Sequence, residues 1–203
     1  MKKLYENIED INIRGGVSQL SEVVTAMDIA LQNIAENTYQ LVGQLIRYSA
    51  SNKGTQYEKV VNTSMALREE LYDASVELNE MQNQIVAYQN KIYRYEEMAE
   101  SAQRPNPYLV SKNQHINAET SVIQFNRNDM MNVAALLKNY SERVFHHIKT
   151  INEKKNSIAN VWQDSQYDTF AEFIDVVTRN VIEALREFEE YYLYLQEKIK
   201  ELS

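Results

Sequence analysis

The residues of this chain best suited to chemistry are its three histidines and its carboxylates. Glu142 and His146 are four residues apart, which places them on one face of a helix, and His147 follows directly. A metal ion needs three or four ligands, and the remaining histidine, His115, lies far along the chain. Carboxylate-bridged di-iron bundles need a Glu-x-x-His pair on each of two helices, a pattern that this sequence lacks. We therefore expect surface histidines, with no metal and no other cofactor.

Patterns for other catalytic chemistry are also missing from the sequence. There is no cysteine, no glycine-rich phosphate loop and no nucleophile beside a base. The 29 acidic residues outnumber the 21 basic ones, giving a net charge of −8. An acidic surface repels nucleic-acid phosphates. The sequence therefore predicts a protein that is not an enzyme and does not bind nucleic acid.

Tyrosine, with 14 copies, is the other chemically distinctive residue type. Tyrosine is favoured at protein interfaces, although tyrosines also pack along the seams between helices. Six tyrosines are clustered near two predicted helix ends: Tyr88, Tyr93, Tyr95, Tyr191, Tyr192 and Tyr194. Tyr191, Tyr192 and Tyr194 cannot all face one side of a helix, which favours an exposed aromatic patch.

The elements that would position these side chains are long helices. Apolar residues make up 44 % of the chain, yet only 4 glycines and 2 prolines interrupt it. Sheets need frequent turn residues, whereas a few long helices need almost none. No stretch approaches the 18 or so apolar residues of a membrane span. We predict an all-α fold without a transmembrane helix.

Apolar residues recur at alternating steps of three and four in the first half of the chain, as in coiled coils. One such seam, from Leu20 to Tyr48 with a polar interruption at Thr38, follows Gly15 and Gly16 and predicts a helix over 17–48. A second, from Tyr57 to Tyr95, predicts a helix over 55–102. The short turn between them makes residues 1–103 an antiparallel helical hairpin.

The second predicted helix is much longer than the first, so its far end needs cover from elsewhere. Ile85, Tyr88, Ile92 and Tyr95 lie in this overhang. Their cover would come either from the rest of the chain or from another chain. The sequence thus predicts a homodimer or a helical protein partner if the chain itself does not cover them.

Pro105 and Pro107 stop the helical pattern and begin a connector over 104–126, which contains a short β-like run, Ser121–Phe125. Asn128 and Asp129 suit a new helix start. A third seam, from Met130 to Val161, predicts a helix over 128–160, and a fourth, from Phe170 to Leu202, predicts a helix over 166–202. Together these two helices form a second predicted hairpin spanning 127–203. The two hairpins form either a four-helix, coiled-coil-like bundle or separate tandem units.

The two hairpins coincide when the second is shifted back by 113 positions. Val133 then falls on Leu20 and Phe170 on Tyr57, and the two turns overlap. Matching heptads alone would not align the turns. The pattern indicates two similar hairpins and is consistent with an internal duplication.

The turn of the second hairpin contains the only tryptophan, Trp162, and an aromatic residue, Phe170, follows eight positions later. This segment resembles the WXG family, small helical hairpins exported by type VII secretion systems, over about residues 127–203. Asp164 stands where the family prefers glycine, and aspartate tolerates a positive φ better than most residues. In the first hairpin, Ser49 stands where Trp162 would map, so that half resembles a degenerate copy.

The resemblance implies an interaction protein that works by helix-on-helix association. It would be a component, substrate or targeting partner of a type VII secretion system, binding a secreted effector or the secretion machinery. Family members often carry an export signal in which an acidic residue follows a tyrosine by four positions; Tyr93 and Glu97 fit it. The start of the chain lacks the apolar segment of a Sec-type signal, so the expectation is a cytoplasmic protein exported without a cleaved leader.

Two alternatives remain at this point. A generic cytoplasmic or phage coiled-coil adaptor would share only the hairpin geometry, whereas a pore-forming toxin is disfavoured because no apolar hairpin is present. For Trp162 itself, the indole ring suits either a partner contact or a cap on the core of its own hairpin.

Overall fold

The computed structural model describes residues 10–95, 97, 101–102, 124, 126–160, 162 and 165–202. Of these residues 90 % are helical and none forms a strand, which confirms the all-α prediction. The elements are α1 (Asp10–Tyr48), α2 (Thr55–Tyr95), α3 (Arg127–Ser157) and α4 (Ser165–Glu201).

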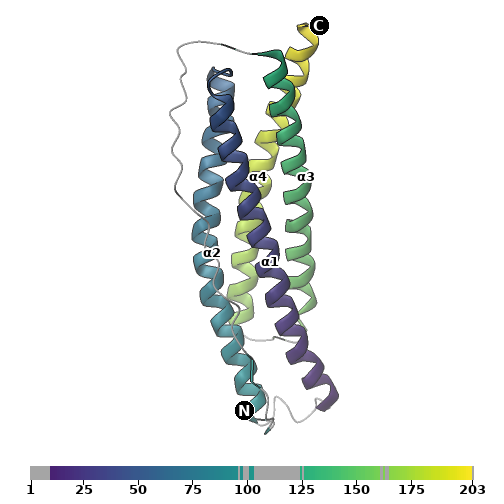
Figure 1. The fold of residues 1–203 in the computed structure, drawn as a ribbon. Coiled ribbons are helices and arrows are strands. Elements are labelled where there is room, and N and C mark those ends of the chain that lie inside the picture. Colours follow the sequence, from purple (N-terminus) through teal and green to yellow (C-terminus); the bar gives the residue numbers. More distant parts are fainter. Residues whose placement is uncertain are drawn as a thin grey trace.

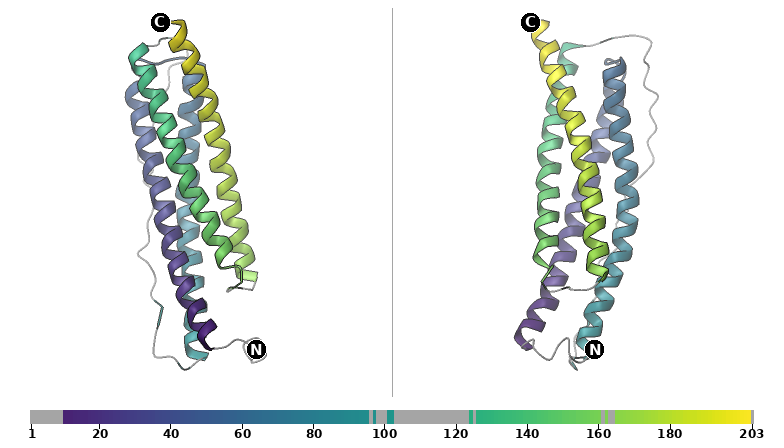
Figure 2. Two further views of the ribbon diagram at one scale, coloured as in Figure 1. Left: turned by 90° about the vertical axis from the view of Figure 1, so that its right-hand side faces the viewer. Right: turned by 180° about the vertical axis from the view of Figure 1, so that it is seen from behind.

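The four helices form a single bundle (Figure 1). Helices α1 and α4 run in one direction, and α2 and α3 run in the opposite direction (Figures 1 and 2). The contacting pairs are α1 with α2, α2 with α4, α4 with α3, and α3 with α1. Every neighbouring pair is therefore antiparallel. The two hairpins pack on each other and are not separate tandem units.

The predicted seams supply the core. All described residues of the third seam, from Met130 to Ile158, are buried, and so are those of the first seam from Leu20 to Leu45. Buried apolar side chains from all four helices join in one cluster. Burying an aliphatic or aromatic side chain contributes roughly 1.5–3 kcal/mol, so the packing between the hairpins is a main source of stability.

Helix α1 begins at Asp10, whereas the sequence predicted a start at residue 17. The prediction was wrong because it treated Gly15 and Gly16 as a helix boundary. Glycine in a helix costs about 1 kcal/mol relative to alanine, but it creates no clash and keeps its N–H donor. A long helix anchored by packing elsewhere can therefore include both glycines.

Helix α2 ends at Tyr95 and not at residue 102. Just beyond it, Glu97 has a positive φ of 54°, the left-handed conformation in which helices commonly end. With 39 residues in α1 and 41 in α2, the expected overhang of the second helix disappears. Instead, both helices extend past the turn that joins α3 to α4 (Figures 1 and 2).

The segment that joins α2 to α3 is held near each of its ends by a contact of a described residue. The backbone N–H of Ala102 donates to Asn90 of α2 at 2.9 Å. At the other end of the bundle, Gln124 makes an isolated antiparallel bridge with Lys53 in the α1–α2 turn. Most of the predicted connector, including both prolines and the run from Ser121 to Ile123, lies outside the described residues.

Helices α3 and α4 lie close to their predicted bounds. The cap of α3 is Asn126, whose side chain accepts hydrogen bonds from the backbone N–H groups of Asn128 and Asp129. Asn128 and Asp129 are therefore the first-turn residues that receive the cap, not the cap itself. This cap satisfies two of the otherwise unpaired N–H groups at a helix start.

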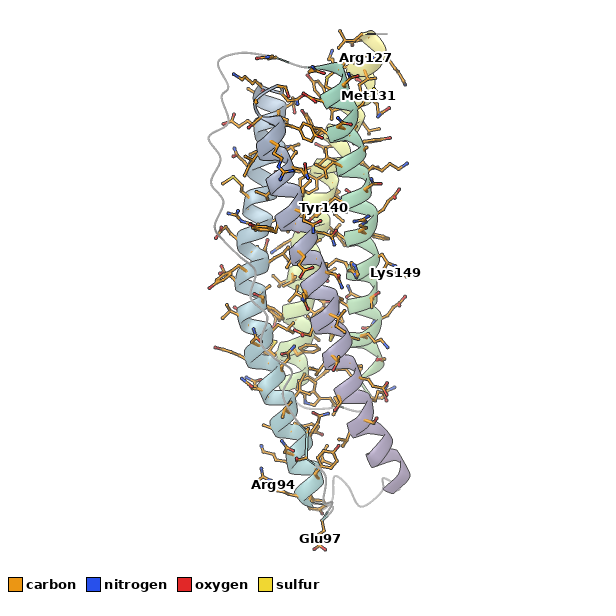
Figure 3. All side chains as sticks on the ribbon, viewed as in Figure 1. Arg94, Glu97, Arg127, Met131, Tyr140 and Lys149 are labelled. Carbon is orange, nitrogen blue, oxygen red and sulfur yellow. The ribbon has the colours of Figure 1, made fainter. Side chains whose placement is uncertain are left out.

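The polar interruption at Thr38 has a partner from the other hairpin. Its hydroxyl oxygen lies 2.8 Å from the Ile34 carbonyl oxygen and 2.6 Å from the Tyr140 hydroxyl oxygen. Because the single hydroxyl hydrogen of Thr38 is donated to Ile34, Tyr140 donates to Thr38. Figure 3 labels Tyr140 on the side of α3 that faces α1, and Lys149 on the outer side. This hydrogen bond fixes the register of α1 against α3.

Burial raises the pKa of the Tyr140 hydroxyl above its ordinary value of 10.0. Because the folded pKa is the higher one, the folded state binds more protons above pH 10, and stability falls as the pH rises from there. We expect Tyr140→Phe to lose about 0.5–1.5 kcal/mol at pH 7 but to show a shallower loss of stability above about pH 10. Urea unfolding at a series of pH values measures both effects. If the free energy of unfolding falls with pH above pH 10 as steeply in Tyr140→Phe as in the unmodified protein, the Tyr140 hydroxyl is not the group that causes the fall.

Candidate functional site

The turn between α3 and α4 is built around Trp162. Helix α3 closes at Ser157 with Ile158 as its cap residue, and the backbone N–H of Trp162 donates to the Ile158 carbonyl at 2.9 Å. Only 1 % of Trp162 is exposed. The turn therefore folds the indole inward, over the end of the bundle core.

Three aromatic rings surround the indole. Phe170 lies at 5.6 Å between ring centroids with an interplanar angle of 38°, and Tyr167 lies at 5.9 Å with an angle of 72°. Both belong to α4. The third ring, Tyr88 at 6.3 Å, comes from α2 and thus from the first hairpin. Trp162 therefore caps its own hairpin and also joins the two hairpins.

This geometry decides between the two roles open to Trp162. A ring that is 1 % exposed is not accessible to a partner, so the partner-contact interpretation does not apply to the closed bundle. Within the described residues, the indole Nε1 has no hydrogen-bond partner, which leaves aromatic packing as its main interaction. Asp164, the residue at the family's glycine position, lies outside the described residues.

The expected overhang residues on α2 are mostly covered by the chain itself. Ile85 belongs to the main core, and Ile92 packs with Val17 of α1 where the first hairpin extends beyond the second. Tyr88 is half-buried against Trp162, whereas Tyr95 is 46 % exposed. No second chain is needed to cover this end of α2, because α1 starts earlier than the sequence indicated.

The three tyrosines near the end of α4 do not form one patch. Tyr191 is buried against Tyr57 of α2 at 6.4 Å, and burial raises the pKa of its hydroxyl above the usual range. Tyr194 stacks on Tyr191 at 5.7 Å. Tyr192 lies half-buried in a groove between α3 and α4. Successive helix positions point in different directions, as the sequence indicated.

The histidine pair lies on the outer part of α3. The rings of His146 and His147 are 5.6 Å apart, and desolvation, together with repulsion from His146, lowers the pKa of His147. Among the described residues, no three metal-ligating side chains gather at one place. His115 lies outside the described residues.

The candidate export signal spans the end of α2. Tyr93 is half-buried in the last helical turn and packs near Val17 and Ile92. Glu97 is exposed just beyond the helix, and Figure 3 places it at the tip of the bundle. Both residues lie at the end where the first hairpin extends beyond the second.

A groove of about 550 Å³, which was not predicted from the sequence, lies on the outer face of α3 and α4. Its base includes the buried side chains of Leu137, Leu185 and Phe188. Phe145, which is 57 % exposed, also lines it and projects from α3. We call this feature the α3–α4 groove. A signal was present in the sequence, because Phe145 lies next to the seam residue Val144 and outside the seam itself.

Charged side chains border the α3–α4 groove on both sides. Lys138 and Glu142 lie on α3, and Arg186 and Glu189 lie on α4. A second groove, between α1 and α3, has a volume of about 700 Å³ and is lined mainly by amide, tyrosine and small side chains. The α3–α4 groove is therefore the one that combines apolar walls with charged rims.

Arg68 is a second feature that the sequence analysis missed. This α2 residue is only 1 % exposed, and its guanidinium forms an ion pair with Glu69 at 3.0 Å, the one ion pair it makes among the described residues. Its Nε and Nη1 atoms have no hydrogen-bond partner within the described part of the chain. Ser75, Gln82 and Gln89 follow Arg68 at steps of seven, so buried polar residues occupy one flank of the α2 seam from Arg68 to Gln89.

No family model, curated protein or solved structure matches this chain. None of the described helices is both long enough and apolar enough to cross a membrane. The fold class comes from the structure itself: an antiparallel four-helix bundle formed by two hairpins.

Proposed function

We propose that this chain is a non-enzymatic interaction protein, a WXG-like component, substrate or targeting partner of a type VII secretion system. The observation that carries the proposal is the turn tryptophan. Trp162 lies in the α3–α4 turn with its ring 5.6 Å from Phe170, the aromatic residue eight positions later. The same two residues carry the sequence resemblance, and a spacing of eight positions across the turn brings their rings into contact.

The bundle also determines which surfaces are available for association. Its seams are filled from within, since one buried cluster spans all four helices. A partner would therefore bind the outer faces of the helices and would not complete the core. Such binding suits a helical partner, whose side chains can lie between those of the bundle. A secreted effector or a subunit of the machinery is the partner expected for this role.

The test is export from a Gram-positive-type host with and without its membrane-bound secretion ATPase. We expect the chain in the culture supernatant only when the ATPase is present. Glu97→Ala should reduce export strongly, because Glu97 is exposed beyond α2 and its loss removes half of the candidate signal without disturbing the core. Tyr93→Ala should act in the same direction.

Tyr95→Ala is the matched control, since Tyr95 lies in the same helical turn and is 46 % exposed. It should be exported like the unmodified protein. Equal amounts in the supernatant of both strains would count against the proposal, and would leave a coiled-coil adaptor as the better description. Export that depends on the ATPase but not on Glu97 would instead refute only the assigned signal.

A further inference from the structure

We infer that the α3–α4 groove is a self-association surface whose occupant is a second copy of this chain. This inference is independent of the proposed role in secretion. A contact related by a two-fold axis uses the same patch on both copies, so the patch must contain both a projection and a recess. The groove supplies the recess, about 550 Å³ with Leu137 and Phe188 in its lining, and Phe145 supplies the projection at 57 % exposure.

The alignment of α3 against α4 places the four rim charges. The rings of Tyr140 and Phe188 lie 5.5 Å apart, and the helices are antiparallel. Moving two residues back along α3 therefore corresponds to moving two residues forward along α4. The level of Lys138 is then close to Glu189, and the level of Glu142 is close to Arg186.

Each rim thus carries one positive and one negative charge, in opposite order along the bundle axis. If two copies pack with this face together and their bundles parallel, Lys138 meets Glu189 and Glu142 meets Arg186. If the bundles are antiparallel, Lys138 meets Glu142 and Arg186 meets Glu189. Both two-fold arrangements pair only opposite charges, a pattern that favours docking and excludes wrong registers.

These charges are available for such contacts. Within the described residues, no ion pair joins one rim of the groove to the other, and the recorded pair between Lys138 and Glu142 is long, at 4.0 Å. The four rim charges also sum to zero, whereas the whole chain carries −8. Two copies can therefore meet at this face without adding local like-charge repulsion to that of their net charges.

The first test is sedimentation equilibrium of the full chain, from low micromolar to several hundred micromolar. We expect a monomer–dimer equilibrium that Phe145→Glu weakens at least about tenfold, because a charge would enter the apolar groove. Ile29→Glu is the control, since Ile29 is 52 % exposed on α1, away from the groove. It should leave the dissociation constant unchanged. A monomer at every concentration, or a dimer equally weakened by both variants, would overturn the inference.

The second test reverses rim charges. Glu142→Lys should weaken the dimer about tenfold or more, because it places like charges opposite each other. Adding Arg186→Glu should restore association if the bundles are parallel, and adding Lys138→Glu should restore it if they are antiparallel. Rescue by either second substitution supports pairing of two copies at this groove. If neither rescues the dimer, the charge pairing across the groove is refuted.

Discussion

Replacing Trp162 with alanine is expected to lower the free energy of unfolding by about 3–5 kcal/mol, the usual cost of deleting a buried aromatic side chain. The indole is 1 % exposed and contacts rings from both α4 and α2. Its loss therefore weakens the closure of the second hairpin and the attachment of that hairpin to the first. Because the surrounding rings come from two helices, Phe170 and Tyr167 from α4 and Tyr88 from α2, they cannot close over the space without shifting one helix against the other.

Urea unfolding followed by circular dichroism measures this effect. Tyr95→Ala is a suitable comparison, because it also deletes an aromatic ring but one that is 46 % exposed and lies outside the α3–α4 groove. Its cost should stay within about 0.5 kcal/mol, as for most surface substitutions. Trp162→Phe should retain much of the stability. A loss below about 1 kcal/mol for Trp162→Ala would show that the indole is not packed as described.

Replacing Arg68 with methionine should have the opposite sign and stabilise the bundle by about 1–4 kcal/mol. Burying a guanidinium removes its hydrogen bonds to water. Few protein hydrogen bonds replace them, since Nε and Nη1 of Arg68 have no partner within the described part of the chain. The carboxylate of Glu69 is 45 % exposed, so it can be solvated again once the arginine is gone. Methionine reproduces the flexible, unbranched stem of the arginine as far as Nε and packs in the same apolar surroundings, and only the space of the guanidinium group is given up.

The same unfolding measurement tests this prediction. Arg179→Met serves as the control, because Arg179 is exposed on α4 and its replacement removes the same charge without changing the interior. It should shift stability by less than about 0.5 kcal/mol. If Arg68→Met destabilises the protein, Arg68 makes a favourable interaction that its single ion pair does not account for.

The four helices could be predicted from the sequence because the apolar periodicity of each seam indicates directly which side chains are buried. An apolar side chain at steps of three and four is informative about its own exposure, and the seam residues from Leu20 to Leu45 are buried as expected. Helix ends were less predictable. Gly15 and Gly16 looked like a boundary, but two unfavourable residues are outweighed by a long packed helix. The wrong bounds then produced an overhang on α2 that does not exist.

The environment of Trp162 shows where sequence reasoning reached its limit. Its contact with Phe170 needs only the local turn, since both residues lie within one hairpin and eight positions apart. Its contact with Tyr88 depends on how the hairpins dock, which no local pattern specifies. The α3–α4 groove has the same origin, because its shape results from the packing of helices and its charges are ordinary seam-flanking residues. Arg68 was missed because an arginine is expected at the surface.

The order in which the helices run has a consequence for how the chain folds. Contacts within a hairpin are shortest in sequence near its turn, such as Asn152 and Thr178, 26 positions apart, and lengthen to 72 positions for Val17 and Gln89 at the far end of the first hairpin. Contacts between hairpins join distant residues, such as Thr38 and Tyr140, 102 positions apart. Loop closure costs only about 0.6 kcal/mol more for each doubling of length, so the distant pairing is affordable but slower to find. Each hairpin can therefore form first from local contacts, and docking of the two preformed hairpins becomes the late step of folding.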